Sequence, residues 1–151
     1  MTKNAPINAQ QIPEYSAKSL YPEPFASMVK HRTRRKLGDY FGLTNFGINF
    51  TTLASGSISA LKHHHSKQDE FIYIISGTPT LVYGDNEFLM SPGDCFGFKA
   101  NSGIAHQLLN RSSSDVTYIE VGDRLPADSV EYPYDDLALV QKADGTWSVL
   151  H

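Results

Sequence analysis

The stretch from residue 62 to residue 75 reads KHHHSKQDEFIYII, and it decides both the fold class and the candidate site. Successive side chains of a β-strand point to opposite faces, so His63 and His65 share one face while His64 points away. Glu70 opens the apolar run that follows, and its carboxylate can lean across from that neighbouring strand. Imidazoles and a carboxylate that converge in this way suit Mn, Fe, Ni, Cu or Zn. The pattern therefore predicts a metal site built on strands.

Three adjacent histidines also occur in solvated loops and in affinity tags. A tag is disfavoured because the run lies in mid-chain, between two segments with the pattern of strands. A solvated cluster stays open on local spacing alone, since short motifs have many chance matches. The choice depends on what surrounds the histidines.

The residues around the histidines resemble the first motif of the cupin superfamily. That motif has a glycine, a spacer, His-x-His, a short gap, a glutamate, six residues and a second glycine. In this chain its residue types stand at Gly56, His63, His65, Glu70 and Gly77.

A second stretch resembles the other motif of the same family, in the same order along the chain. It reads Gly93, then Asn101-x-Gly103-x-x-His106, then three residues and Asn110. Asn101 replaces the proline of the usual Pro-x-Gly, and the spacer after Gly93 is longer than usual. We therefore expect a looser turn before His106. The two motifs together cover roughly residues 47–122.

The resemblance implies an all-β chain folded as a double-stranded β-helix, which is a jelly-roll barrel. It implies one divalent transition metal per chain, with His63, His65, Glu70 and His106 as its ligands. Zn, Fe, Mn and Ni all suit such a set, because imidazole and carboxylate accept several metals. A second layer of groups should hold the ring nitrogens that do not face the metal. Asp69 is one candidate for this role, although the favoured interpretation is that Asp69 is an exposed turn residue.

The remainder of the chain also predicts short strands separated by turns. Residues 45–50 alternate between apolar and polar, and residues 80–83 and 87–90 flank a Gly-Asp-Asn turn. Many short strands with such turns indicate a sandwich or barrel. We expect an N-terminal arm over 1–44, a barrel core over 45–122 and a C-terminal extension over 123–151. That extension should end in a hairpin, with Trp147 as a core or interface anchor.

The run after Glu70 is apolar at every position, which predicts burial on both faces. If Glu70 points inward, Ile72 and Ile74 do too, and the side chains at 71, 73 and 75 point outward. The N-terminal arm, the C-terminal hairpin or a second subunit must then cover the outer face. Since the small cupins that the chain resembles commonly dimerise, we expect a homodimer.

Composition excludes several classes of protein. A length of 151 residues with 40% hydrophobic residues predicts one globular domain. The net charge of −3 gives no reason to expect nucleic-acid binding. We expect no membrane segment, because no apolar run is long enough, and the polar start lacks a signal peptide. Cys95, the single cysteine, excludes an internal disulfide and favours a buried thiol in a cytoplasmic protein.

Other residues allow more than one interpretation. The basic stretch 30–36 could contact nucleic acid, a phosphate or a carboxylate, but a solvated edge or pairing with acidic residues is favoured. Tyr83, Tyr118 and Glu120 could supply polar groups to a pocket, although ordinary strand positions are the simpler reading. For Phe96 and Phe98 the sequence does not distinguish the inner wall from the general core.

The leading functional hypothesis is a metal-dependent enzyme acting on a small oxygen-rich metabolite. An oxygenase, a decarboxylase, a lyase and a sugar-phosphate isomerase are all within the range of the cupins. The alternative is a non-catalytic module that binds or senses a small molecule. A third possibility is a structural cupin without a working site, which the complete ligand set disfavours.

Overall fold

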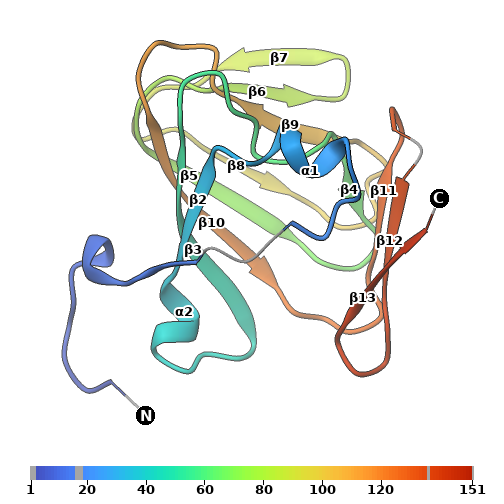
Figure 1. Cartoon of the computed structure of the whole chain (residues 1–151), viewed down its shortest axis with the longest axis horizontal. Helices are drawn as coiled ribbons and strands as arrows, with labels where there is room; N and C mark the ends of the chain where they lie inside the picture. The colour runs from blue at the N-terminus through green and yellow to red at the C-terminus, as the bar shows by residue number, and fades with distance from the viewer. Residues whose placement is uncertain (1–2, 16–18, 136, 151) are drawn as a thin grey trace.

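The computed structural model describes residues 3–15, 19–135 and 137–150, and in this part the chain is built mainly of antiparallel strands (Figure 1). The largest sheet has the strand order β1-β2-β3-β10-β5-β8. Its strands are β1 (Glu14–Tyr15), β2 (Arg32–Lys36), β3 (Phe46–Leu53), β10 (Val116–Asp123), β5 (Glu70–Ser76) and β8 (Cys95–Phe98). The neighbours β3 and β10 pair along their full length, from Val116 opposite Leu53 to Asp123 opposite Phe46.

Two smaller sheets complete the barrel. One has the order β7-β6-β9, and the other has the order β13-β12-β11-β4. Their strands are β4 (His64–His65), β6 (Thr80–Tyr83), β7 (Asn86–Leu89), β9 (His106–Leu109), β11 (Ser129–Tyr132), β12 (Leu137–Gln141) and β13 (Trp147–Leu150). The helical segments are short: η1 (Ala9–Gln11), α1 (Phe25–Met28) and α2 (Leu37–Tyr40). The predicted all-β jelly-roll fold is confirmed.

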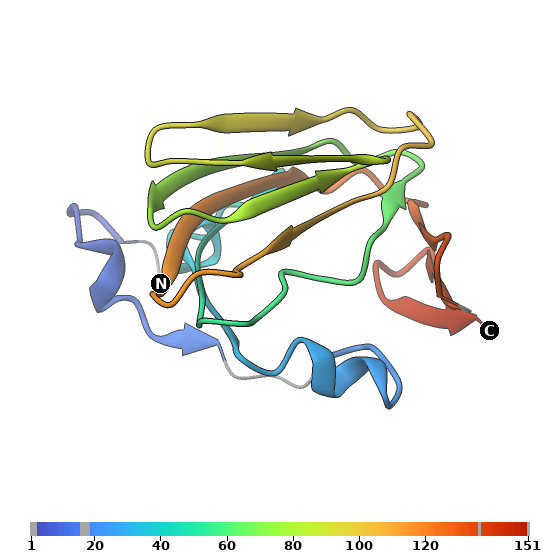
Figure 2. The same cartoon turned by 90° about the horizontal axis from the view of Figure 1, so that it is seen from above.

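The core lies between the large sheet and the β7-β6-β9 sheet. Alternation places every second side chain of each strand inside, so Ile74, Leu81 and Val116 are almost completely buried. A second cluster lies beneath the C-terminal strands and contains Leu61, Val130, Tyr132, Leu137 and Leu139. Residues 3–13 and the C-terminal strands lie at opposite ends of the barrel (Figure 2), whereas Tyr21 and Phe25 pack against the second cluster.

The predicted alternation along β5 is present, but its outer face is open. Ile72 and Ile74 are 7% and 0% exposed, whereas Phe71, Tyr73 and Ile75 are 40%, 44% and 40% exposed. Among the described residues, neither the N-terminal segment nor the C-terminal hairpin covers this face. The chain therefore presents an apolar strip where the sequence predicted burial.

The prediction of a buried thiol is wrong. Cys95 is exposed, because it pairs with Tyr73 on the outward side of the large sheet. The N-terminal segment covers a different part of the molecule: Ile12 is buried and its carbonyl accepts a hydrogen bond from Arg35 of β2. Cys95 therefore belongs to the apolar strip around β5 and not to the core.

The predicted hairpin at the C-terminus is formed by β12 and β13. It continues through β11, which pairs with β4 so that Val130 lies opposite His65. The C-terminal segment is thus joined by hydrogen bonds to a strand of the candidate site. The boundaries at 44/45 and 122/123 stay a prediction.

Two turns show why their residues are needed. Gly77 ends β5 with a φ of +83°, and a Cβ there would lie 2.7 Å from the Asp115 carbonyl oxygen. Asn101 has a φ of +59°, and its N–H donates a 2.9 Å hydrogen bond to the His65 carbonyl. Proline could supply neither the φ nor the N–H. The asparagine therefore ties this turn to the strand that carries His65.

Within the described residues, the structure contains no helix with the length and apolar character needed to cross a bilayer.

Candidate metal centre

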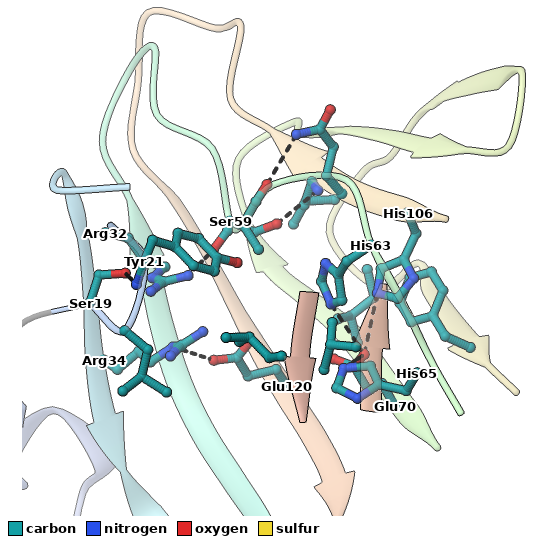
Figure 3. Close-up of a pocket in the computed structure, with 18 of the residues that line it drawn as sticks. Ser19, Tyr21, Arg32, Arg34, Ser59, His63, His65, Glu70, His106 and Glu120 are labelled. Carbon is teal, nitrogen blue, oxygen red and sulfur yellow. Dashed lines mark hydrogen bonds and ion pairs between the residues drawn. The ribbon is translucent and has the colours of Figure 1, made fainter. Parts of the chain in front are cut away.

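A cavity of about 510 Å³ opens inside the barrel and contains all four predicted ligands (Figure 3). Its walls come from the large sheet, from the segment around β4 and from the C-terminal strands. The polar residues that line it include Tyr21, Arg32, Arg34, Lys36, His63, His65, Glu70, His106, Tyr118, Glu120 and Tyr132. Its size is that of a pocket for a small metabolite.

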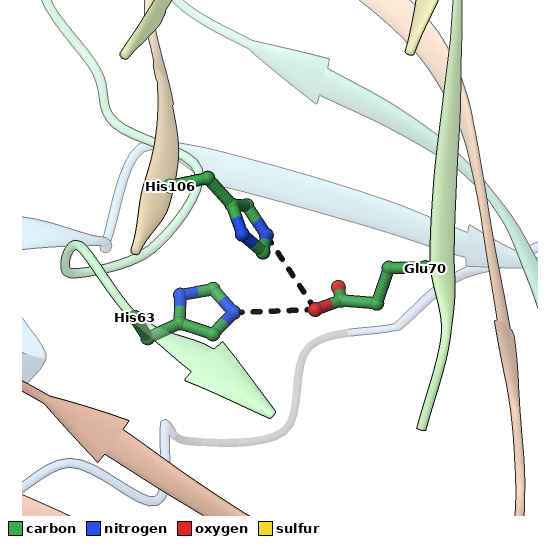
Figure 4. A group of neighbouring side chains, drawn as sticks. All are labelled: His63, Glu70 and His106. Atoms are coloured by element: carbon green, nitrogen blue, oxygen red, sulfur yellow. Dashed lines mark ion pairs between the residues drawn. The ribbon is translucent and has the colours of Figure 1, made fainter. Parts of the chain in front are cut away.

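Glu70 is the point on which the imidazoles converge. Its Oε1 lies 2.8 Å from His65 Nε2 and 3.5 Å from both His63 Nε2 and His106 Nε2. His63, Glu70 and His106 offer ligand atoms that all lie within 4.8 Å of one another (Figure 4). His65 stands slightly apart from this group, although its Nε2 makes the shortest contact with Glu70.

Backbone pairing explains how residues far apart in sequence meet here. The His63 N–H donates to the His106 carbonyl at 3.1 Å, and the His106 N–H donates to the His63 carbonyl at 2.8 Å. Glu70 begins β5 on the facing sheet. His64 alternates to the other side, where its Nε2 lies 3.5 Å from Glu131 Oε2, and it does not line the cavity.

The other ring nitrogen of two imidazoles is held in place. His63 Nδ1 lies 2.7 Å from the Leu61 carbonyl oxygen, and since a carbonyl only accepts, Nδ1 carries the proton. Nε2 is therefore the ring nitrogen that faces Glu70 and could bind a metal. The His106 ring stacks on Phe98 with 3.6 Å between centroids and 10° between planes, which assigns Phe98 to the inner wall. Such support is typical of metal-binding histidines.

The residue that orients His65 is Asp128, which the sequence analysis missed. Its Oδ2 lies 2.6 Å from His65 Nδ1, and the carboxylate is 0% exposed. Its Oδ1 accepts hydrogen bonds from the Lys67 N–H at 2.7 Å, the Gln68 N–H and the Ser66 hydroxyl. Asp69 is exposed, as the favoured interpretation held, and accepts a hydrogen bond from the Ala100 N–H beside the start of β5.

The site suits a cation. Glu70 Oε1 is buried and has no hydrogen-bond partner of good geometry among the described residues, although three imidazole nitrogens surround it. Burial opposes ionisation of Glu70, but the imidazoles outweigh burial and hold its pKa well below the usual value. For His106, burial disfavours the protonated, charged imidazole and so lowers the pKa. The ionised Glu70 carboxylate and the neutral His106 imidazole match the protonation states that a divalent transition metal requires, whereas His65 must lose a proton when the metal binds.

The raised pKa of His65 leads us to expect that stability depends on pH in opposite ways in the metal-free and the metal-loaded protein. Burial lowers its pKa, but Asp128 and Glu70 more than offset this and raise it from 6.5 to about 9. Protonated His65 therefore stabilises the metal-free fold fully below pH 6.5, and this contribution disappears as the pH rises to 9. The loss is on the order of 3 kcal/mol.

Urea denaturation of chelator-treated protein at several pH values between 6.5 and 9 measures this loss. His65→Gln should remove the pH dependence. Protein loaded with a divalent metal should become more stable over the same range, because the metal competes with the His65 proton. Identical pH dependence with and without metal would contradict the assignment of His65.

The other residues singled out from the sequence lie partly in the cavity and partly outside it. Tyr118 and Glu120 line the cavity, whereas Tyr83 packs against Phe96 beside the core. Asn110 is buried and donates from its amide to the Leu53 and Ser114 carbonyls, so it secures the backbone as predicted. Trp147 packs against the cluster beneath the C-terminal strands and also lines the cavity.

The basic stretch pairs with acidic residues, as favoured from sequence: Arg34 with Glu120 and Arg35 with Glu14. It also lines the cavity, which was not expected. Alternation along β2 turns Arg32, Arg34 and Lys36 inward. The signal that could have revealed this was the spacing of basic residues at every second position.

The chain is similar to proteins of known family and structure. Residues 49–122 match the family model described as a cupin domain. A sugar phosphate isomerase of the cupin superfamily from Silicibacter pomeroyi is 33% identical, with a TM-score of 0.90, over 97% of this chain and 92% of that one. A candidate sugar phosphate isomerase from Acidithiobacillus ferrooxidans is 30% identical, with a TM-score of 0.73, over 79% and 75% of the two chains.

More distant structures share the fold alone. A polyketide cyclase from Streptomyces resistomycificus is 18% identical, with a TM-score of 0.61, over 82% of this chain and 80% of that one. Among functionally curated proteins, none matches the chain.

Proposed function

This chain belongs to the cupin superfamily, and from that premise we propose that it is a metal-dependent enzyme acting on a small oxygen-rich metabolite. One observation carries the proposal: three imidazoles surround a buried carboxylate oxygen in a cavity of about 510 Å³. His63, His65, Glu70 and His106 would hold one divalent ion per chain. A bound ion of this kind polarises a carbonyl or carboxylate, or supports oxidative chemistry.

The chain's own residues then bind and orient the substrate. Tyr118 and Tyr132 line the cavity and are buried, and burial raises the pKa of both hydroxyls. Each therefore keeps its proton at neutral pH and serves as a donor to a substrate oxygen. Phe98, Leu81 and Leu108 form an apolar wall that limits access of water beside His106.

A sugar derivative is the favoured substrate class. Two similar structures, at 33% and 30% identity, carry the names of sugar phosphate isomerases. A sugar offers carbonyl and vicinal hydroxyl oxygens, and these are the oxygen ligands that would face the metal centre. A carboxylate or dicarbonyl metabolite offers the same type of contact.

The test uses metal-loaded protein with aldoses, ketoses and hydroxy acids, followed by NMR and by an oxygen electrode. Turnover that disappears in His106→Ala supports the enzyme. Stabilisation against heat by one compound without its conversion supports the alternative, a binding or sensor module. Absence of both effects with every compound, at full metal occupancy, would contradict a small-molecule function.

We also propose a homodimer that covers the outer face of β5. Phe71, Tyr73 and Ile75 form an exposed apolar strip, and such a strip favours a protein partner. Tyr73→Glu should convert a particle of about twice the chain mass into a monomer, because it buries a charge at the interface. Light scattering after size-exclusion chromatography measures the mass. Leu89→Glu, an exposed position on β7, is the control, and a monomeric wild type would contradict the proposal.

A further inference from the structure

Three basic side chains of β2 face the cavity from the wall opposite the histidines. Arg32, Arg34 and Lys36 line the cavity, whereas the intervening Arg35 points outward and pairs with Glu14. In Figure 3, Arg32 and Arg34 stand on one side of the cavity, and the three histidines with Glu70 stand on the other. Glu120 lies between the two groups. The cavity thus has a cationic wall and a metal-binding wall.

The cationic wall is only partly neutralised. Arg34 Nε lies 2.8 Å from Glu120 Oε1, and the same oxygen accepts a 2.8 Å hydrogen bond from the Thr51 hydroxyl. Arg32 donates to the Ser59 carbonyl and has no carboxylate partner among the described residues. Lys36 Nζ lies 3.5 Å from the centroid of the Tyr15 ring and also lacks a carboxylate there.

The charge of the cavity is therefore positive, in contrast to the chain as a whole. Three cationic side chains line it, against the carboxylates of Glu70 and Glu120. A divalent ion on the opposite wall would add two further positive charges. The complete chain has a net charge of −3, so positive charge is concentrated in the cavity. A field of this sign attracts and retains anions.

Arg32 is suited to an anionic ligand and not to a structural ion pair. Arg32 is partly buried, so its charge is costly unless it is paired, and one backbone carbonyl does not neutralise a guanidinium. The planar guanidinium carries five N–H donors, of which only part face the Ser59 carbonyl. The remaining donors match the geometry of a carboxylate or phosphate.

Tyr118 provides a second, independent indication. Its side chain is 1% exposed and lines the cavity, and its hydroxyl has no hydrogen-bond partner among the described residues. On β10, Tyr118 lies opposite Thr51 of β3 and Ile74 of β5, between the cationic wall and the metal centre. A buried hydroxyl without a partner is expected to be satisfied by a ligand.

We propose that the substrate carries a phosphate or carboxylate group that binds Arg32 and Lys36, while its hydroxyl or carbonyl oxygens face Tyr118 and the metal centre. This inference rests on the proposed function and specifies its substrate as a small oxygen-rich anion. Strand β2 lies three strand spacings from β5, about 14 Å at the backbone. Side chains extend inward from both strands, so the remaining gap suits a short metabolite and not a polymer.

Three matched probes test the proposal: ribose 5-phosphate, ribonate and neutral ribose. Binding is measured by calorimetry and by the fluorescence of Trp147, the single tryptophan, which lines the cavity. Metal-free and metal-loaded protein are both titrated. At least one anion should bind about 10- to 100-fold more tightly than ribose, the range expected for hydrogen bonds to charged groups. Whether the phosphate or the carboxylate binds more tightly identifies the group.

Variants connect this preference to the cationic wall. Arg32→Gln should remove most of the preference for the anion, and Arg32→Lys should retain part of it. Lys36→Gln should weaken anion binding several-fold without affecting the binding of ribose. If Arg32→Gln does not fold, Lys36→Gln tests whether anion binding depends on the cationic wall. Arg111→Gln is the control, because Arg111 pairs with Glu87 on the surface, outside the cavity.

The outcomes separate this inference from the proposed function. Anion preference that depends on Arg32 or Lys36 in metal-free protein supports the inference, even if no metal is ever bound. Metal-loaded protein that binds ribose and both anions equally would overturn the inference and leave the metal centre intact. Anion preference that is unchanged in both Arg32→Gln and Lys36→Gln would also overturn it.

Discussion

Replacement of Glu70 by alanine should abolish stoichiometric metal binding. Its Oε1 is the atom that all three imidazole Nε2 atoms approach, at 2.8 to 3.5 Å, so its removal leaves the imidazoles without the carboxylate they share. His65→Ala should have a similar effect, since His65 makes the shortest of these contacts. We expect metal affinity to fall by more than about 100-fold in each variant, which exceeds the loss usual for residues outside the ligand shell.

Elemental analysis of purified protein, followed by competitive titration with a chelator, measures this loss. His64→Ala is a matched control. His64 lies between the proposed ligands His63 and His65 in sequence, but its side chain points toward Glu131 outside the cavity. It should bind metal as the wild type does. Full metal content in both Glu70→Ala and His65→Ala would reject the assignment of the ligands.

Replacement of Asp128 by alanine should affect stability and the metal site together. The buried carboxylate receives bonds from His65, the Ser66 hydroxyl and two backbone N–H groups. Its removal leaves these donors unsatisfied and the His65 imidazole with Glu70 as its remaining ion-pair partner. We expect the free energy of unfolding to fall by about 3–5 kcal/mol and metal affinity to fall by about 10- to 100-fold.

Asp128→Asn separates the two effects. Asparagine keeps the shape, so the loss of stability in urea denaturation should be smaller than for alanine. An amide nitrogen placed toward His65 Nδ1 would donate a hydrogen bond and favour the tautomer with its proton on Nε2, facing the metal site. Metal affinity should therefore still fall. Asp69→Asn is the control, and an equal loss of metal in that variant would contradict the role of Asp128.

Local alternation accounts for the part of the site that could be predicted from sequence. His63 and His65 face the cavity and His64 does not, because a strand has a period of two residues. The same period correctly assigned Ile72 and Ile74 to the core. These inferences needed no knowledge of which strands pair.

Contacts between distant strands could not be predicted in this way. Asp128 reaches His65 because β11 pairs with β4, and no local spacing relates these segments. Arg32 faces the cavity because β2 pairs with β3 inside the large sheet, so that alternate residues of the basic stretch line the cavity. Cys95 was misassigned because small apolar residues are usually buried, whereas its pairing with Tyr73 places it outside.

The cavity wall also has a consequence for how such a protein can diversify. The four residues that converge on the centre all lie within 49–122, the part that matches the family model. Arg32, Tyr21, Trp147 and Asp128 come from the flanking segments, outside that part. Substitutions at Arg32 should therefore change which ligand the cavity prefers without altering the four converging residues, whereas Asp128 couples the C-terminal flank to the centre because it orients His65.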